Sequence, residues 1–311
     1  MDYDQQRRQL FRVGAALGFG TALSNIANAQ APEATAGQVA PTTLHDTAPG
    51  DRSTLTVERR GHIVLLGINR PAAQNLLDPA TSALLSHAYF QFEHDPSLRA
   101  AVLFGHGQHF CQGVDVAAWA PVIAAHGDAV AKPETIDLVG KTKPKLTKPI
   151  VVAVHGNTWN LGHELHLACD IRIAAANTSF AQTENTHARF PGGGSTIRFV
   201  REAGWAQAMR YLLTGDAWTA NDALRMGIIQ EIAPTPDAAL QRAIELAQKI
   251  AACAPLSIKT TLASAHLALN EGEEAAFAAL GPQRTALYAT EDFKENLRSI
   301  AEHRAPVYVG K

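Results

Sequence analysis

The sequence has no marked excess of charge of either sign. It carries 27 lysine and arginine residues against 29 aspartate and glutamate residues, and its formal net charge at pH 7 is −2. No basic stripe stands out from this balance, which excludes a nucleic-acid-binding protein. Hydrophobic residues make up 46% of the chain and charged residues 18%, a composition typical of a soluble globular protein.

Cysteines are few, and the histidines lack the spacing of metal ligands. The three cysteines are Cys111, Cys169 and Cys253. Two of them adjoin predicted buried strands, so we interpret them as small buried hydrophobic residues. In an oxidising compartment one pair could instead form a disulfide. Histidines gather at positions 106, 109, 155, 163, 166 and 187, but no pair falls in a recognised metal motif, and we expect no metal site.

No apolar run is long enough to span a bilayer comfortably. The candidate run, Val13 to Leu23, is short and rich in glycine and alanine, and it follows the paired arginines Arg7 and Arg8. Ala27-Asn28-Ala29 supplies a small-x-small cleavage site. We therefore predict a twin-arginine-type signal peptide over residues 1–29, which implies a periplasmic protein without a membrane anchor. The protein is cytoplasmic if that interpretation is wrong. Residues 30–52, rich in Ala, Pro, Thr and Gly, are predicted to be flexible.

Residues 148–194 carry the pattern that indicates chemistry. Ile150 to Val154 predicts a buried strand, Asn157 to Gly162 a polar turn, and Glu164 onward a short buried helix. The free amides at such a helix start favour negative charge above the turn. Glu184 and a Phe-Pro-Gly-Gly-Gly turn at 190–194 follow. Two glutamates therefore flank one candidate oxyanion pocket.

The rest of the chain predicts alternating strands and helices. Two strands fall within 54–68, Asp78 caps a helix that ends at Glu93, and a strand covers 100–104. Residues 119–146 predict a broken helix that acts as a lid. Beyond the central stretch, helices are predicted over 204–213, 220–226, 237–252, 257–270 and 273–300, with a short strand over 228–232.

The central stretch resembles the enoyl-CoA hydratase/isomerase (crotonase) family, whose pattern there is KPxxAAVxGxxxGGGxELxxxCD. Further segments that resemble the family are Asn69-Arg70-Pro71, Phe110 to Asp115 and Leu213-Thr214-Gly215, so that the likeness covers roughly residues 54–308. It implies an α/β, crotonase-like (ClpP/crotonase) fold. A spiral of repeated ββα units would occupy residues 53–235, and a C-terminal helical region at 236–311 would form trimer contacts.

The resemblance also implies roles for individual residues. The backbone amides of Val114 and Leu161 would hold a thioester oxygen as an enolate forms. Glu164 would activate the water, and Glu184 would supply a proton to the α-carbon, because two neighbouring carboxylates push each other's pKa values apart. Residues expected to line the substrate site are Asn75, Gly113, Asp115, Gly162, Pro191 and Gly192. His163 and His187 adjoin the glutamates and are candidates for an accessory role.

The chain departs from the family where Gly-Gly-Gly is replaced by Asn160-Leu161-Gly162. This change favours an altered substrate, as does the tension between a periplasmic signal and cytoplasmic coenzyme A esters. Three hypotheses follow: an acyl-thioester hydratase or isomerase, an exported hydrolase of a diketone or ester with a histidine that aids water attack, and an inactive binding protein. The two adjacent glutamates argue against the third. We expect no cofactor beyond coenzyme A as part of the substrate, and the resemblance implies a homotrimer or a hexamer of two trimers.

Overall fold

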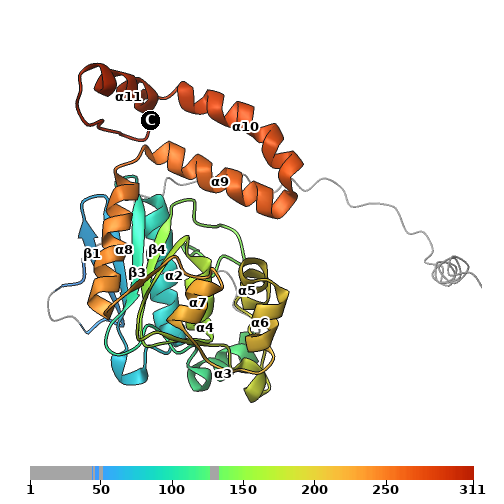
Figure 1. Cartoon of the computed structure of the whole chain (residues 1–311). Coiled ribbons are helices and arrows are strands. Elements are labelled where there is room, and N and C mark those ends of the chain that lie inside the picture. The colour runs from blue at the N-terminus through green and yellow to red at the C-terminus, as the bar shows by residue number, and fades with distance from the viewer. Residues whose placement is uncertain (1–43, 45, 49–51, 127–132) are drawn as a thin grey trace, which may run out of the picture. The chain divides into compact units, whose positions relative to one another are not determined.

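A six-stranded sheet forms the centre of the structure (Figure 1). The computed structural model describes residues 44, 46–48, 52–126 and 133–311. The strands lie in the order β1 (Leu55–Arg60), β2 (Ile63–Ile68), β3 (Ala100–Gly105), β4 (Ile150–Val154), β6 (Ile171–Ala175) and β9 (Glu231–Ala233). β1 pairs antiparallel with β2, and every later pair in this sheet is parallel.

The sheet is buried on both faces, which explains its continuous apolar strands. All residues of β2 and β4 are buried. One face packs against α8 (Pro236–Ala251) through alanines such as Ala243 and Ala247. The other face packs against α2 (Pro79–His94) and α4 (Leu161–Ala168) through larger side chains such as Phe92. The loops that follow the parallel strands therefore meet at one edge of the sheet, where α/β proteins usually bind ligands.

The structure has a second, three-stranded sheet, and two of its strands directly follow strands of the main sheet along the chain. Its strands are β5 (Asn157–Trp159), β7 (Ser179–Ala181) and β8 (Trp218–Thr219), with β5 parallel and β8 antiparallel to β7. β5 leads directly into α4, and β7 leads into η2 (Glu184–His187). The small sheet thus fixes the starting points of the two segments that carry Glu164 and Glu184.

The remaining helices cover the sheets or extend the C-terminal region. They are η1 (Pro71–Ala73), α3 (Val116–His126), α5 (Ser195–Ala203), α6 (Trp205–Leu212), α7 (Ala220–Arg225), α9 (Pro255–Glu271), α10 (Glu273–Tyr288) and α11 (Glu291–Ala301). α9 has no buried residue and α10 has one, Ala276. Within the described ranges, no helix is both long and apolar enough to cross a membrane.

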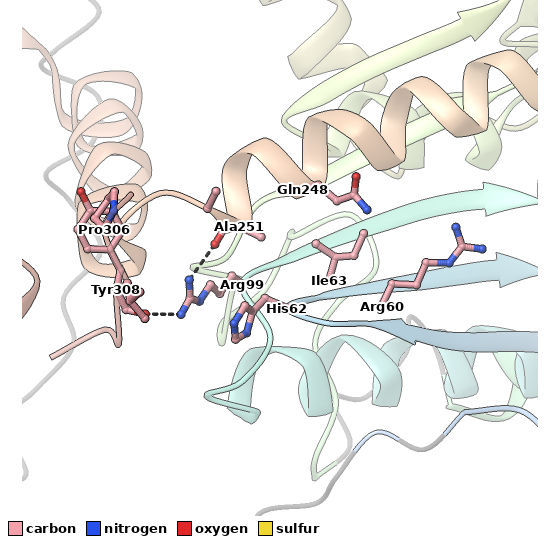
Figure 2. A pocket seen from close by; sticks show the side chains of 10 residues that line it. Arg60, His62, Ile63, Arg99, Gln248, Ala251, Pro306 and Tyr308 are labelled. Carbon is pink, nitrogen blue, oxygen red and sulfur yellow. Dashed lines mark hydrogen bonds between the residues drawn. The ribbon is translucent and has the colours of Figure 1, made fainter. Parts of the chain in front are cut away.

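Arg99 ties the end of α8 to the C-terminal tail (Figure 2). Its guanidinium donates to the carbonyl oxygen of Ala251 at 2.8 Å and to that of Tyr308 at 2.6 Å. A cavity of about 360 Å³ lies between these groups and the start of β2. This cavity is at the amino ends of the strands, whereas the loops with the predicted catalytic residues follow the carboxyl ends. It is therefore separate from the candidate active site.

Most elements predicted from the sequence are present, and the differences have local causes. The α/β class, the paired strands at 55–68 and the Asp78 cap are confirmed, the cap by a 2.7 Å bond from the Thr81 amide. The polar turn predicted at 157–162 is wrong, because β5 pairs there with β7 and α4 already begins at Leu161. The single helix predicted over 273–300 is two, since Thr290 caps a new helix by accepting from the Phe293 amide at 3.1 Å. The strand predicted at 228–232 begins later, at Glu231, and α5 was not predicted.

Several expectations fall partly or wholly outside the described residues. The predicted signal peptide at 1–29 lies outside them, as do most of the predicted flexible segment and positions 127–132 of the predicted lid. The end of the flexible segment differs from expectation. Leu44 is buried, and the Thr47 amide donates to the Val57 carbonyl oxygen at 2.9 Å, so this part of the chain lies along β1.

Arg172 in β6 holds together the segments behind the active-site helix. Its side chain is 8% exposed and donates to the carbonyl oxygens of Cys169, at 3.0 Å, and Leu167, at 2.9 Å. These carbonyls belong to the end of α4, where backbone acceptors lack helical partners. The guanidinium also forms a two-point ion pair with Glu202 of α5. Arg172 therefore links β6, α4 and α5.

We expect Arg172→Leu to lower the free energy of unfolding by about 3 kcal/mol, because it leaves Glu202 and the α4 carbonyls without a buried partner. Arg201→Leu is the matched control. Arg201 is 43% exposed and lies 3.4 Å from the same carboxylate, so its loss should cost less than about 1 kcal/mol. Denaturant unfolding at one fixed protein concentration measures both. Equal effects of the two substitutions would contradict this role of Arg172.

Candidate active site

Glu164 lies in the first turn of α4 and is 3% exposed. Its carboxylate accepts a hydrogen bond from the Ser195 amide at 3.2 Å. Burial raises the pKa of Glu164, and the backbone N–H groups of Ser195 and Gly193 offset part of that rise. A Cβ atom on Gly193 would lie 2.3 Å from the Glu164 carboxylate. The glycine turn at 192–194 therefore lies against this carboxylate, and a side chain at 193 would displace the Glu164 carboxylate from its position.

Glu184 begins η2 and is 6% exposed. Burial raises its pKa to about 7, and the negative charge of Glu164 adds to the rise, while Arg189 opposes it. The Glu164 carboxylate is therefore close enough to influence the protonation of Glu184. A pair in which one group is protonated and the other ionised near neutral pH can both donate and accept a proton.

Two backbone amides in neighbouring loops are free to bind an anion. No hydrogen-bond acceptor is recorded, among the residues that the structure describes, for the N–H of Val114 or of Leu161. Val114 follows the loop after β3, and Leu161 is the first residue of α4, where a helix leaves its N–H groups unpaired. These are the two amides that the sequence predicts for an oxyanion hole.

The loops that carry these amides are bonded directly to each other. The Trp159 amide donates to the Cys111 carbonyl oxygen at 3.0 Å, and the Cys111 amide donates to the Asn157 carbonyl oxygen at 3.3 Å. A Cβ atom on Gly162 would lie 2.1 Å from the Cys111 carbonyl oxygen. Gly162 is therefore required for the close approach of the two loops that carry these amides.

Asn160 takes a backbone conformation that usually needs glycine, with φ 52° and ψ −124°. Its side chain explains why asparagine is stable there. The amide nitrogen donates to the Gln112 carbonyl oxygen at 3.3 Å, and the amide oxygen accepts from the Thr183 N–H at 2.8 Å. Asparagine at this position thus links the loop after β3, the start of α4 and the segment after β7. Leu161 packs partly against the core.

The structure places the other predicted substrate-site residues in two groups. Asn75 is fully buried, and its side-chain amide donates to the carbonyl oxygens of His106, at 2.8 Å, and His109, at 2.7 Å. Asp115 accepts from the Ala118 amide at 3.2 Å and lies 3.6 Å from Arg70. Both side chains hold loops in place. Gly113, Gly162, Pro191 and Gly192 lie in the segments that surround the two amides and Glu164.

The two candidate histidines differ in their exposure: His163 is buried, and His187 is exposed. His163 is completely buried, and burial lowers its pKa to about 3. The His187 Nδ1 atom is bonded locally, 2.9 Å from the Thr183 carbonyl oxygen. No group of three potential metal ligands occurs in the described part of the chain. The three cysteines form no disulfide, and Cys111 and Cys169 are buried, as the sequence predicts.

Gln182 and Ser195 belong to the site and were not predicted from the sequence. The Ser195 amide binds Glu164, and the Ser195 hydroxyl is bonded to the Gln182 side chain, which in turn lies next to Glu184. The signal for Gln182 was its position two residues before a predicted catalytic glutamate. For Ser195 the signal was its place directly after the glycine turn, where a helix starts.

Comparisons with known proteins identify the family of this chain. The sequence pattern of the family described as enoyl-CoA hydratase/isomerase matches residues 58–311. The enoyl-CoA hydratase EchA19 of Mycobacterium tuberculosis is 35% identical over 252 residues, which are 80% of this chain and 94% of that protein. The (E)-benzylidenesuccinyl-CoA hydratase of Thauera aromatica is 34% identical over 257 residues, which are 82% of this chain and 99% of that protein.

A solved structure confirms the crotonase-like fold. The crystal structure of a probable enoyl-CoA hydratase/isomerase from Mycobacterium abscessus has a TM-score of 0.81 and 40% sequence identity, and the match covers 84% of this chain and all of that one. The C-terminal helices lie within the matched part. The chain therefore belongs to the enoyl-CoA hydratase/isomerase family and is an enzyme of the hydratase type.

Proposed function

We propose that the enzyme adds water across the double bond of an α,β-unsaturated acyl thioester of coenzyme A. The observation that carries this proposal is the pair of buried carboxylates, Glu164 and Glu184, next to two free backbone amides in adjoining loops. Hydration of an enoyl thioester needs a group that removes a proton from water, a group that delivers one to the α-carbon, and a site for the negative charge on the carbonyl oxygen. Each need has a counterpart here.

The amides of Val114 and Leu161 form the oxyanion hole in this proposal. Their N–H groups are held by the bonds between the Cys111 loop and β5, so they need no rearrangement as charge develops. A preorganised donor of this kind stabilises the transition state more than the ground state. The positive end of the α4 dipole adds to the effect at Leu161.

The protonation states assign the two glutamates. Burial raises the pKa of Glu184 to about 7, so this group carries a proton below that pH and delivers it to the α-carbon. Glu164 is held by backbone N–H groups that favour its ionised form, so it accepts the proton from water. Activity then falls as pH rises through the pKa of Glu184, and it falls at low pH as Glu164 becomes protonated.

The relatives support a coenzyme A ester as substrate. Their names include a benzylidenesuccinyl-CoA hydratase and a 2,3-dehydroadipyl-CoA hydratase, so acids with a second carboxylate or an aromatic ring are worth including in a substrate panel. The hydrolase alternative assigns water activation to His163 or His187. Full burial of the His163 ring argues against His163 in that role, whereas His187 is exposed.

We expect Glu164→Gln and Glu184→Gln each to lower kcat by roughly 10²- to 10⁴-fold, since each removes one proton-transfer group without changing its size. Turnover is followed by the loss of enoyl-thioester absorbance with short, medium and aromatic enoyl-CoA esters. Glu271→Gln, a change of an exposed carboxylate on α9, is the matched control and should leave kcat unchanged. A variant, either Glu164→Gln or Glu184→Gln, that keeps the kcat of the wild type would contradict the assignment of that glutamate to proton transfer.

The C-terminal helices support assembly into a trimer or a hexamer of two trimers. Large apolar side chains stand exposed on α9, α10 and α11, namely Leu269, Phe277, Leu280, Tyr288, Leu297 and Ile300. Exposed apolar surface of this kind usually meets another subunit.

We expect the wild-type protein to have three or six times the mass of one chain in light scattering coupled to size-exclusion chromatography. The double substitution Phe277→Asp and Leu280→Asp should reduce that mass, because it places charges in the proposed contact. Leu84→Asp, which charges a half-exposed position on α2, serves as the control. A monomeric wild-type protein would overturn the proposed assembly.

Residues 1–29 support export by the twin-arginine route, and residues 30–52 would connect this signal to the folded enzyme. The proposed reaction uses no cofactor other than the coenzyme A of the substrate itself. Fused to a reporter that is active only outside the cytoplasm, residues 1–40 should direct export in a bacterial host, and Arg7→Lys with Arg8→Lys should abolish it. Unchanged export in that double variant, or none in the wild type, would remove the periplasmic assignment. Export of the active enzyme would in turn favour a substrate without coenzyme A.

A further inference from the structure

His163 lies in α4, next to Glu164 in the sequence, and its imidazole is buried. It has no exposed surface, and it packs edge-on against the rings of Phe180, Phe199 and Trp218 at centroid distances of 5.8, 5.2 and 5.0 Å. A buried polar ring among aromatics normally has a hydrogen-bonding purpose. Its Nε2 atom has no partner among the described residues, so the purpose must lie at Nδ1.

The Nδ1 atom of His163 faces the side chain of Gln182. The near end of the Gln182 amide lies 3.1 Å from Nδ1, and it is also bonded to the Ser195 hydroxyl. The far end of the same amide lies 2.8 and 3.1 Å from the two carboxylate oxygens of Glu184. The amide therefore bridges a buried histidine and a predicted catalytic acid.

Only one orientation of the amide suits an ionised Glu184. With its nitrogen toward Glu184, Gln182 donates to the carboxylate and accepts from His163 Nδ1–H and from the Ser195 hydroxyl. In the opposite orientation the amide oxygen would face the carboxylate oxygens, and the nitrogen would face His163 Nδ1 and the Asn160 carbonyl oxygen. Two facing acceptors repel each other, so the donor at His163 Nδ1 decides which end of the amide meets Glu184.

We propose that His163 is a positioning residue that, by donating from Nδ1 to Gln182, turns the amide nitrogen of Gln182 toward Glu184 and so fixes the carboxyl group that delivers the proton. This inference rests on the proposed function, because it assigns a purpose to the orientation of Glu184. The ring stays neutral throughout, since burial and the positive charge of Arg172 lower its pKa to about 3. A neutral imidazole retains one N–H to donate.

The arrangement has a consequence for protonation. Hydrogen bonds from the Gln182 nitrogen favour the ionised form of Glu184 and hence oppose the rise in its pKa that burial causes. Loss of these bonds raises that pKa further. Other charges facing Glu184 are Glu164 on α4 and Arg189 after η2, and those facing His163 are Arg172 on β6 and His166 on α4. Substitutions at position 163 leave all four in place.

Two variants of nearly equal size separate positioning from packing. His163→Asn keeps an N–H donor close to the position of Nδ1, whereas His163→Leu removes it, and both leave a similar cavity among the aromatic rings. We expect the alkaline limb of the pH profile of kcat to move up by about one pH unit in His163→Leu, because Glu184 then keeps its proton to higher pH. We also expect kcat at its optimum to fall roughly tenfold or more with little change in KM, since the carboxyl group is less well oriented.

The asparagine variant should retain the wild-type position of the alkaline limb. Equal profiles in the two variants, or a limb in His163→Leu that stays or moves down, would overturn the inference and leave His163 a packing residue. If the His163 ring only fills space, both variants should lose stability and activity to a similar extent. The alkaline limb of the pH profile would then not move in His163→Leu alone.

A second measurement does not depend on turnover. The infrared band of the protonated Glu184 carboxyl, assigned by its loss in Glu184→Gln, is titrated against pH in the wild type and both variants. A higher midpoint in His163→Leu alone supports the inference, and an unchanged midpoint overturns it even if the enzyme is active. A shifted midpoint in a protein without hydratase turnover would overturn the proposed function and leave the positioning role of His163 standing.

Discussion

The contact between the loop after β3 and the segment that joins β5 to α4 determines the rest of the site. Gly162 lies against the Cys111 carbonyl oxygen with no room for a side chain, and backbone bonds join Cys111 to β5 on both sides. This contact holds the two loops that carry the Val114 and Leu161 amides against each other at the start of α4. The position of Glu164, three residues later, follows from it. A change that separates the two loops would disturb the anion site and the first carboxylate at once.

The second carboxylate is held by a different set of groups. Glu184 follows β7, and its environment is built from α4, the glycine turn and α5 through His163, Gln182 and Ser195. Ser195 contributes its amide to Glu164 and its hydroxyl to the amide that faces Glu184. One residue thus couples the supports of both acids. Burial raises both pKa values, and the unequal number of hydrogen-bond donors around each group separates them.

The sequence allowed the fold class and most strands of the main sheet to be predicted, the fold class from the family resemblance and the strands from local patterns. β2 and β4 are continuous apolar runs, and Asp78 is a standard helix cap. β5 could not be predicted, since Asn157-Thr158-Trp159 has no strand pattern and becomes a strand only by pairing with β7. The purpose of Asn160 also depends on distant partners, Gln112 and Thr183, which no local pattern identifies. The same is true of His163, whose neighbour in space, Gln182, is remote in sequence.

The central claim is that one substrate oxygen binds both loop amides while the two glutamates face the adjoining carbons. A crystal structure of the enzyme with a saturated acyl thioester of coenzyme A, which cannot take up water, tests it most directly. The account predicts a thioester oxygen about 3 Å from the backbone nitrogen atoms of both Val114 and Leu161, with the carboxyl group of Glu164 toward the β-carbon and that of Glu184 toward the α-carbon. A thioester oxygen that contacts neither amide, or an acyl chain that lies away from both glutamates, would contradict it.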